Sequence, residues 1–76
     1  MAEHSLDCKG LNCPMPIVKI SRAMKGLALG DRLVVEASDP SFGADVEAWA
    51  KRMGHDLVEL SSSPALQRAV LEKKTA

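Results

Sequence analysis

Aromatic side chains are scarce in this 76-residue chain, which has no tyrosine, one phenylalanine and one tryptophan. Proteins that bind single-stranded nucleic acids stack the bases on exposed aromatic rings, whereas Phe42 and Trp49 fall on one apolar helical stripe that we assign to the core. A dominant charge is also lacking, because ten basic residues balance ten acidic ones. We therefore expect no direct binding to nucleic acid or to an anionic membrane.

Long apolar segments and a disulfide framework are absent as well. No apolar run approaches the roughly 20 residues of a membrane span, and the N-terminus lacks the basic-then-apolar pattern of a signal peptide. Two cysteines are fewer than the four or so that small secreted domains usually carry. Cys8 and Cys13 form no recognised zinc spacing with His4 or His55. We expect a single cytoplasmic domain over residues 1–76, with no cofactor and no metal.

The most specific segment surrounds the second cysteine and reads Leu6-Asp7-Cys8-Lys9-Gly10-Leu11-Asn12-Cys13-Pro14-Met15-Pro16. Proline fixes φ, lacks an N–H group and disfavours helix at the preceding residue. The two prolines therefore mark a helix start, with Pro16 as the expected first helical residue and Pro14 as the alternative. Cys13 would then lie within about a turn of the helix N-terminus, where the helix dipole lowers the pKa of a thiol. This makes Cys13 a candidate nucleophile.

The apolar periodicity predicts the order β-α-β-α-β-β. The expected elements are a strand at Ser5–Lys9, a helix at Pro16–Leu29, a central strand at Arg32–Ala37, a helix opened by Asp39-Pro40 and ended by Gly54, and a strand at Asp56–Ser61. The last segment is helical by propensity. We nevertheless favour a strand near Arg68–Lys73, because the preceding strand would otherwise leave an open edge.

This order predicts an α/β (α+β) two-layer sandwich, in which a four-stranded mixed sheet carries two helices on one face. The second helix should face the sheet with Phe42, Val46, Trp49, Ala50 and Met53. The first helix should carry a basic outer stripe of Lys19, Arg22 and Lys25, which is either a solvated face or a docking surface for an acidic patch.

Leu6-Asp7, Gly10 and Cys13-Pro14-Met15-Pro16 together resemble the signature of the TusA/SirA-like sulfur-carrier family. The resemblance continues through Gly30-Asp31, Asp39-Pro40, Asp45 and Gly54-His55. It implies a fold similar to the C-terminal domain of bacterial translation initiation factor three. It also implies a carrier-type sulfurtransferase, in which Cys13 accepts sulfane sulfur as a persulfide and transfers it to an acceptor protein.

The resemblance also implies partners and supporting residues. The expected partners are a protein sulfur donor, of the cysteine desulfurase or rhodanese type, and a protein acceptor of the DsrE type or an equivalent. The pathway stays open among tRNA thiolation, cofactor sulfur supply and sulfur oxidation. The motif residues expected to support the site are Asp7, Gly10, Pro14, Met15 and Pro16. Those expected to contribute to partner docking are Lys19, Arg22 and Asp45.

Cys8 lies outside this motif and leaves an alternative open. Free cysteine on a strand usually behaves as a small buried apolar residue. The sharper interpretation is a thiol-disulfide redox switch, in which Cys8 is a resolving thiol for Cys13. A non-catalytic interaction or nucleic-acid module is a third reading, and it rests on fold analogy alone.

Overall fold

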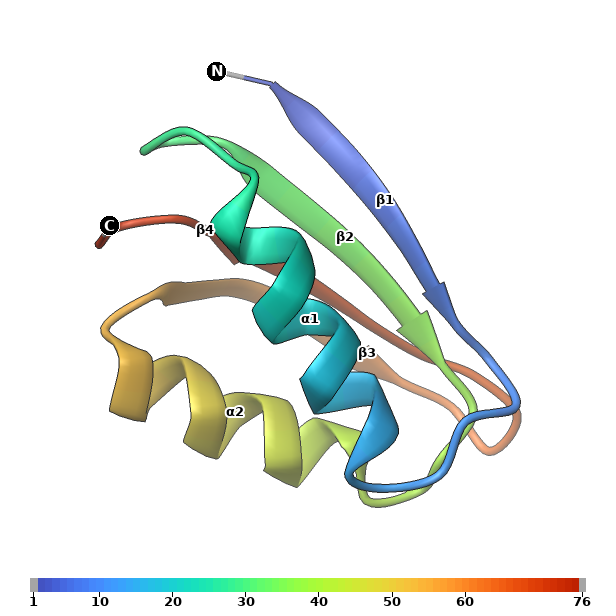
Figure 1. The fold of residues 1–76 in the computed structure, drawn as a ribbon. Coiled ribbons are helices and arrows are strands. Elements are labelled where there is room, and N and C mark those ends of the chain that lie inside the picture. The colour runs from blue at the N-terminus through green and yellow to red at the C-terminus, as the bar shows by residue number, and fades with distance from the viewer. Residues whose placement is uncertain (1, 76) are drawn as a thin grey trace.

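The computed structural model describes residues 2–75, which form one sheet covered by two helices (Figure 1). The elements are β1 (Glu3–Cys8), α1 (Met15–Lys25), β2 (Arg32–Ala37), α2 (Phe42–Met53), β3 (Asp56–Ser62) and β4 (Gln67–Glu72). The strand order is β1-β2-β4-β3, with β1 parallel to β2 and the other pairs antiparallel. The predicted four-stranded mixed sheet with two helices is confirmed.

The two central strands of the sheet are β2 and β4. The sequence pattern indicates a strand most clearly for β2 and least clearly for β4. β2 alternates as a half-buried strand should, with Leu33, Val35 and Ala37 buried. β4 pairs with both β2 and β3, so its backbone groups are satisfied on both sides and Ala69 and Leu71 are fully buried. The strand predicted near residues 68–73 is therefore confirmed, one residue earlier, and sheet pairing overrides the helical propensity of this segment.

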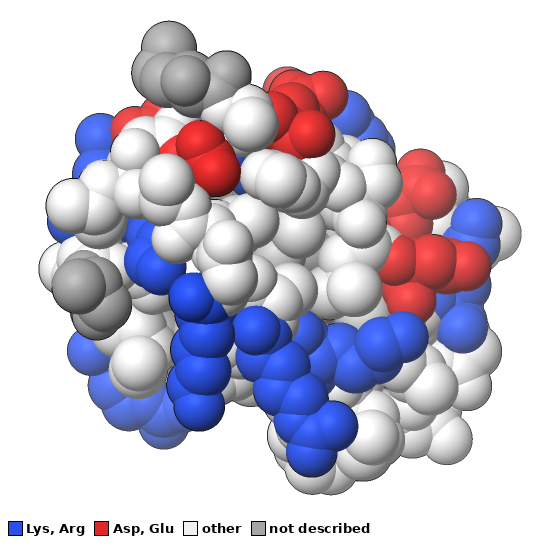
Figure 2. All heavy atoms as spheres, turned by 45° about the horizontal axis from the view of Figure 1, so that its top comes forward, with Lys and Arg blue, Asp and Glu red and all other residues white. Residues whose placement is uncertain are grey.

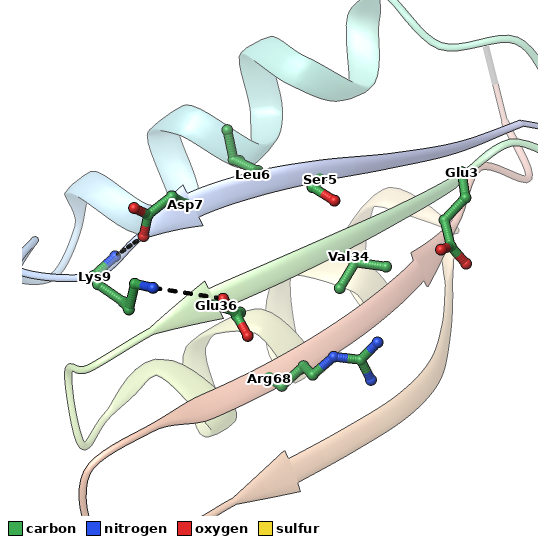
Figure 3. A pocket seen from close by; sticks show the side chains of 8 residues that line it. All are labelled: Glu3, Ser5, Leu6, Asp7, Lys9, Val34, Glu36 and Arg68. Carbon is green, nitrogen blue, oxygen red and sulfur yellow. Dashed lines mark hydrogen bonds and ion pairs between the residues drawn. The ribbon is translucent and has the colours of Figure 1, made fainter.

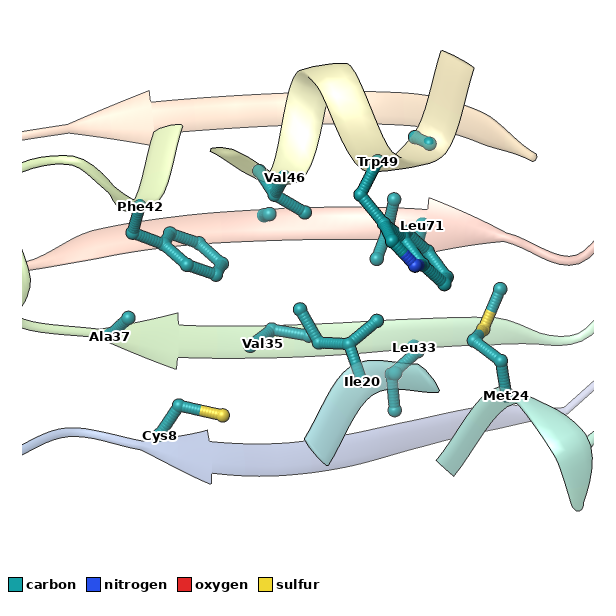
Figure 4. Packing of buried hydrophobic residues seen from close by; sticks show 12 residues of the cluster. Cys8, Ile20, Met24, Leu33, Val35, Ala37, Phe42, Val46, Trp49 and Leu71 are labelled. Atoms are coloured by element: carbon teal, nitrogen blue, oxygen red, sulfur yellow. The ribbon is translucent and has the colours of Figure 1, made fainter. Parts of the chain in front are cut away.

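The core lies between the sheet and the helices (Figure 4). Its fully buried members include Cys8 from β1, Ile20 from α1 and Phe42 from α2. The apolar stripe predicted for α2 is correct except at Met53, whose side chain is 46% exposed. Met53 is the last residue of the helix, and the Thr75 hydroxyl donates to its carbonyl (3.0 Å).

The first half of the chain departs from prediction at the element ends. β1 covers Glu3–Cys8 rather than 5–9, and α1 begins at Met15 with Pro14 as its N-cap, so that Pro16 is the second helical residue. The helix ends at Lys25 rather than at residue 29, because the Gly26 and Leu27 N–H groups bond three residues back in a tightened last turn.

The start of α2 was predicted wrongly. The helix begins at Phe42 with Ser41 as N-cap, not at Pro40 with Asp39 as cap. The Asp39 carboxylate instead accepts hydrogen bonds from Ser41 and from the distant Cys13. Gly54 ends α2 in the left-handed conformation, with φ of 79°, as expected of the glycine that follows a helix.

Across residues 2–75, neither helix is long and apolar enough to cross a membrane.

Candidate functional site

Cys13 is exposed on the loop that joins β1 to α1, two residues before the helix begins. Local hydrogen bonds shape this loop. The Lys9 N–H donates to the Asp7 carboxylate (2.9 Å), and the Leu11 N–H donates to the Cys8 carbonyl (3.2 Å). Between them Gly10 has a φ of 82°, a conformation in which a side chain would be strained. The motif residue Gly10 thus lies in the turn that leads to Cys13, and Asp7, near the end of β1, contacts this turn through its carboxylate.

Two further bonds fasten the loop to the segment that follows β2. The Gly10 N–H donates to the Ser38 hydroxyl (2.9 Å), and the Cys13 N–H donates to the Asp39 carboxylate (2.7 Å). Neither Ser38 nor Asp39 was predicted as a site residue. The available signal was the strand order, because β1 and β2 are parallel and Cys8 pairs with Ala37 at their shared end. The loops after the two strands must therefore meet.

Carboxylates determine the electrostatics of the thiol. Hydrogen bonding to Asp45 raises the pKa of Cys13, and partial desolvation and the negative charges of Asp45 and Asp39 act in the same direction. The expectation that the helix N-terminus would lower this pKa is therefore wrong. Asp45 lies in the first turn of α2 and accepts a bond from the Ser41 hydroxyl (3.3 Å), so both acidic side chains come from the neighbouring helix start. These carboxylates therefore oppose formation of the Cys13 thiolate.

Cys8 differs from Cys13 in accessibility, although the pKa of each thiol is raised. Its side chain is fully buried in the core, and its sulfur lies 4.0 Å from the Pro16 carbonyl. Burial raises the pKa of Cys8, which opposes formation of the thiolate. Both thiols are free. This environment favours the role of Cys8 as a small buried apolar residue. A resolving thiol at this position would have to leave the core to reach an oxidised Cys13.

The basic residues of α1 divide into two groups. Lys19 donates through its ammonium group to the Asp7 carbonyl (3.3 Å) and so braces the cysteine loop. Arg22 and Lys25 lie farther along the helix and line a shallow groove between α1 and α2, together with Arg52. Figure 2 shows Lys and Arg side chains gathered side by side on one face of the molecule.

That groove leads toward the cysteine. It begins at Pro14, next to Cys13, and is lined between the basic residues by Ile17, Val18 and Trp49. Met15, also beside Cys13, is 46% exposed. We call this surface the α1–α2 groove. It combines apolar contact area with positive charge within the helix layer.

A second hollow lies on the open face of the sheet, away from the helices (Figure 3). Asp7, Lys9, Val34, Glu36 and Arg68 are among its lining residues, and the Lys9 ammonium pairs with the Glu36 carboxylate at 3.6 Å. Cys13 does not line it. Mixed charges and the absence of the thiol separate this hollow from the candidate site. In the part of the chain that the structure describes, no three His, Cys, Asp or Glu side chains are grouped to hold a metal ion.

These features define a small α+β protein that presents one exposed thiol at a loop–helix junction. Comparison with known families is consistent with this class: residues 4–73 match the family model described as sulfurtransferase TusA. The chain belongs to the TusA family, as the cysteine motif predicted.

Individual relatives support the same grouping. The chain is 43% identical to YrkI of Bacillus subtilis over 72 residues, covering 95% of this chain and 96% of that protein. It is 39% identical over 57 residues to the sulfur carrier protein TusA of Allochromatium vinosum, covering 75% of each. YrkF of Bacillus subtilis is 46% identical over 68 residues, or 90% of this chain, but the chain spans only 37% of that longer protein.

Among solved structures, a SirA-like protein from Desulfitobacterium hafniense has the same fold. Its TM-score to this chain is 0.81 at 18% identity, and the match covers 95% of this chain and 99% of that one. The likeness concerns the fold.

Proposed function

We propose that this protein is a sulfur carrier that holds sulfane sulfur as a persulfide on Cys13. The observation that carries the proposal is the contrast between the two cysteines, since Cys13 is exposed on a braced loop while Cys8 is sealed in the core. Membership in a sulfurtransferase family supports the same assignment. The proposal places the relay in the cytoplasm, where thiols are kept reduced.

Sulfur uptake then proceeds by thiol exchange. The Cys13 thiol first loses its proton, and the thiolate that the donor releases takes up a proton at the end of the exchange. The Cys13 thiolate attacks the terminal sulfur of a donor persulfide. A new Sγ–S bond forms, the S–S bond of the donor breaks, and the electron pair leaves with the donor as its thiolate. Transfer to an acceptor thiol repeats the exchange in the opposite direction, so no external oxidant is needed.

The motif residues have supporting roles in this proposal. Pro14 and Pro16 lack N–H groups and restrict the backbone on either side of Met15, which keeps the thiol directed outward. Gly10 lies in the turn before Cys13, and the Asp7 carboxylate holds this turn through the Lys9 N–H. Met15, half exposed beside the thiol, supplies an adaptable apolar contact for different partners.

Partner docking is assigned to the α1–α2 groove. Its Arg22, Lys25 and Arg52 fit an acidic patch on a donor of the cysteine desulfurase or rhodanese type, or on an acceptor of the DsrE type or an equivalent. Lys19 contributes through the loop that it braces, and Asp45 through the rim at Cys13. The pathway served would be tRNA thiolation, cofactor sulfur supply or sulfur oxidation, which differ in their partners rather than in the chemistry at Cys13.

Intact mass spectrometry after incubation with a persulfidated cysteine desulfurase tests the assignment. The protein should gain the mass of a sulfur atom, Cys13→Ser should gain none, and the matched variant Cys8→Ser should still be loaded if it is folded. Sulfur gained by Cys13→Ser would refute the assignment. A reversible loss of two hydrogens under mild oxidant that requires both cysteines would favour the redox switch instead.

A further inference from the structure

We propose that Asp39 is the positioning residue for Cys13 and that the buried side chain of Gln67 holds Asp39 in place. The two residues would fasten the cysteine loop to the start of α2 in the orientation from which sulfur is passed on. This inference rests on the proposed role of Cys13 as the sulfur-carrying residue. It concerns how the thiol is held rather than what it carries.

The Asp39 carboxylate joins two segments through both of its oxygens. Oδ2 accepts the Cys13 N–H at 2.7 Å, while Oδ1 accepts the Ser41 N–H at 3.1 Å and the Ser41 hydroxyl at 3.0 Å. These bonds to Ser41 and Cys13 hold the pKa of Asp39 below its ordinary value, so the group is an acceptor at neutral pH. A carboxylate that accepts from opposite sides cannot turn without losing a bond.

Gln67 fixes the backbone of Asp39 from inside the protein. It is the first residue of β4 and is 6% exposed. Its amide group donates to the Asp39 carbonyl at 2.6 Å, and its amide oxygen accepts the Gly43 N–H at 2.9 Å. A Cβ atom at Gly43 would lie 3.0 Å from that oxygen, so the close approach favours glycine. A side chain from a central strand thus fixes both the loop that carries Asp39 and the first turn of α2.

This arrangement leads from the sheet to the thiol in a continuous series of contacts. Gln67 holds Asp39, Asp39 holds the Cys13 N–H, and Ser38 holds Gly10 at the start of the same loop. Thiol exchange requires the attacking sulfur to approach along a restricted line. A misplacement of about 1 Å is enough to cost about a hundredfold in rate. Loss of the Asp39 carboxylate would release one of the two points that hold the cysteine loop.

The test compares Asp39→Ala with Asp31→Ala. Asp31 is a matched control, because its carboxylate also accepts two backbone N–H groups, from Ala2 (3.0 Å) and Ala28 (3.2 Å), but it precedes β2 whereas Asp39 follows it. All measurements are made where urea unfolding shows each variant to be folded. Hydrogen exchange at the Cys13 amide should accelerate by about tenfold or more in Asp39→Ala and stay unchanged in Asp31→Ala.

Two functional readouts complete the test. Sulfur transfer to an acceptor thiol should fall by about tenfold to a hundredfold in Asp39→Ala, and Asp31→Ala should match the unmodified protein. Asp39→Asn retains an oxygen that can accept the Cys13 N–H but has no charge. It should restore much of the transfer rate, while the pH profile of Cys13 alkylation moves to lower pH because a negative charge beside the thiol is gone.

The outcomes separate this inference from the proposed function. Unchanged amide exchange in Asp39→Ala, or equal losses of transfer in the two alanine variants, would overturn the positioning role. Asp39→Asn with a protected amide but transfer as slow as in Asp39→Ala would also overturn it, because charge rather than position would then be the cause. If the unmodified protein takes up no sulfur on Cys13, the proposed function fails, while amide exchange still reports how the loop is held.

Discussion

Replacing the buried Lys73 with methionine should destabilise the protein strongly. Lys73 follows β4 and is 8% exposed, and its ammonium group donates to the carbonyls of Met24 (2.8 Å) and Leu27 (2.7 Å) at the end of α1. These carbonyls lie in the last turn of α1 and just after it, at the negative end of the helix. The Met24 carbonyl also accepts the Leu27 N–H (3.2 Å). Lys73→Met keeps most of the aliphatic volume and removes both hydrogen bonds.

The size of the loss follows mainly from the Leu27 carbonyl, because the Met24 carbonyl keeps the Leu27 N–H as a partner. A buried acceptor left without a partner costs about 1–3 kcal/mol. The loss of the second bond to Met24 adds to this cost, while relief from burying an ammonium group offsets part of it. We therefore expect the free energy of unfolding to fall by about 1–3 kcal/mol. That is a large share of the roughly 4–11 kcal/mol expected for a chain of this length.

Urea unfolding followed by Trp49 fluorescence measures this directly, since Trp49 is the single tryptophan and is 5% exposed. The midpoint should fall while the dependence on urea stays constant. Lys74→Met is the control, because the Lys74 ammonium is half exposed and pairs with Glu72 at 2.6 Å on the surface. Its effect should be much smaller. A loss below about 1 kcal/mol for Lys73→Met, or one no larger than in Lys74→Met, would refute the reasoning.

Three further predictions follow from the same contacts. Asp45→Asn removes the hydrogen-bonded negative charge that raises the pKa of Cys13, so alkylation of the thiol should reach half of its maximal rate at a lower pH; an unmoved pH profile contradicts this. Acidification should weaken the fold in two ranges. Burial and the nearby Lys73 charge lower the pKa of His55 in the folded state, so its contribution is lost as the pH falls below the ordinary value of 6.5. The second range lies below about pH 4, where the carboxylates whose pKa values are lowered by hydrogen bonds take up protons, and these are Asp31, Asp39 and Glu72. Urea midpoints that stay constant from neutral to acid pH would contradict both. Gly54→Ala should cost about 1–2 kcal/mol, because φ is 79° and the new Cβ would lie 3.1 Å from the Thr75 methyl, whereas Gly26→Ala, at a φ of −87°, should be nearly neutral in urea unfolding.

Much of the fold could be predicted from sequence because it depends on local periodicity. Strand β2 and both helices alternate or repeat their apolar residues at the spacing of their structures, and glycine or proline marks most of their boundaries. The exact ends could not be predicted. Leu27, for instance, follows the apolar period of α1 but lies beyond it, in a turn whose carbonyls are taken by Lys73.

Strand β4 shows where periodicity fails and pairing succeeds. Its residues favour a helix when considered alone, and only the need of β3 for a partner indicates a strand. Its central place between β2 and β3 depends on which strand edges are left unpaired once the other strands and the two helices are in place. The local sequence pattern of β4 contains no information about these long-range pairings.

The candidate site divides in the same way. The prolines and Gly10 indicated that Cys13 is the candidate nucleophile, and in the structure Cys13 is exposed while Cys8 is buried. Asp39 was seen only as a helix cap, and Gln67 was not singled out. Their contacts with the cysteine loop and with each other join residues 26 and 28 positions apart, which is outside the range of any sequence motif.

The sequence by itself determined the family, the order of the elements and the cysteine at the loop–helix junction, since each depends on a few neighbouring residues with restricted backbones. Only the tertiary structure decided the electrostatic state of that cysteine. The dipole of its own helix favours a thiolate, but the parallel pairing of β1 and β2 brings Asp39 and the start of α2 with Asp45 to the same edge, and these carboxylates raise the pKa of Cys13. Charge effects act through space, so they become known only when the chain is folded.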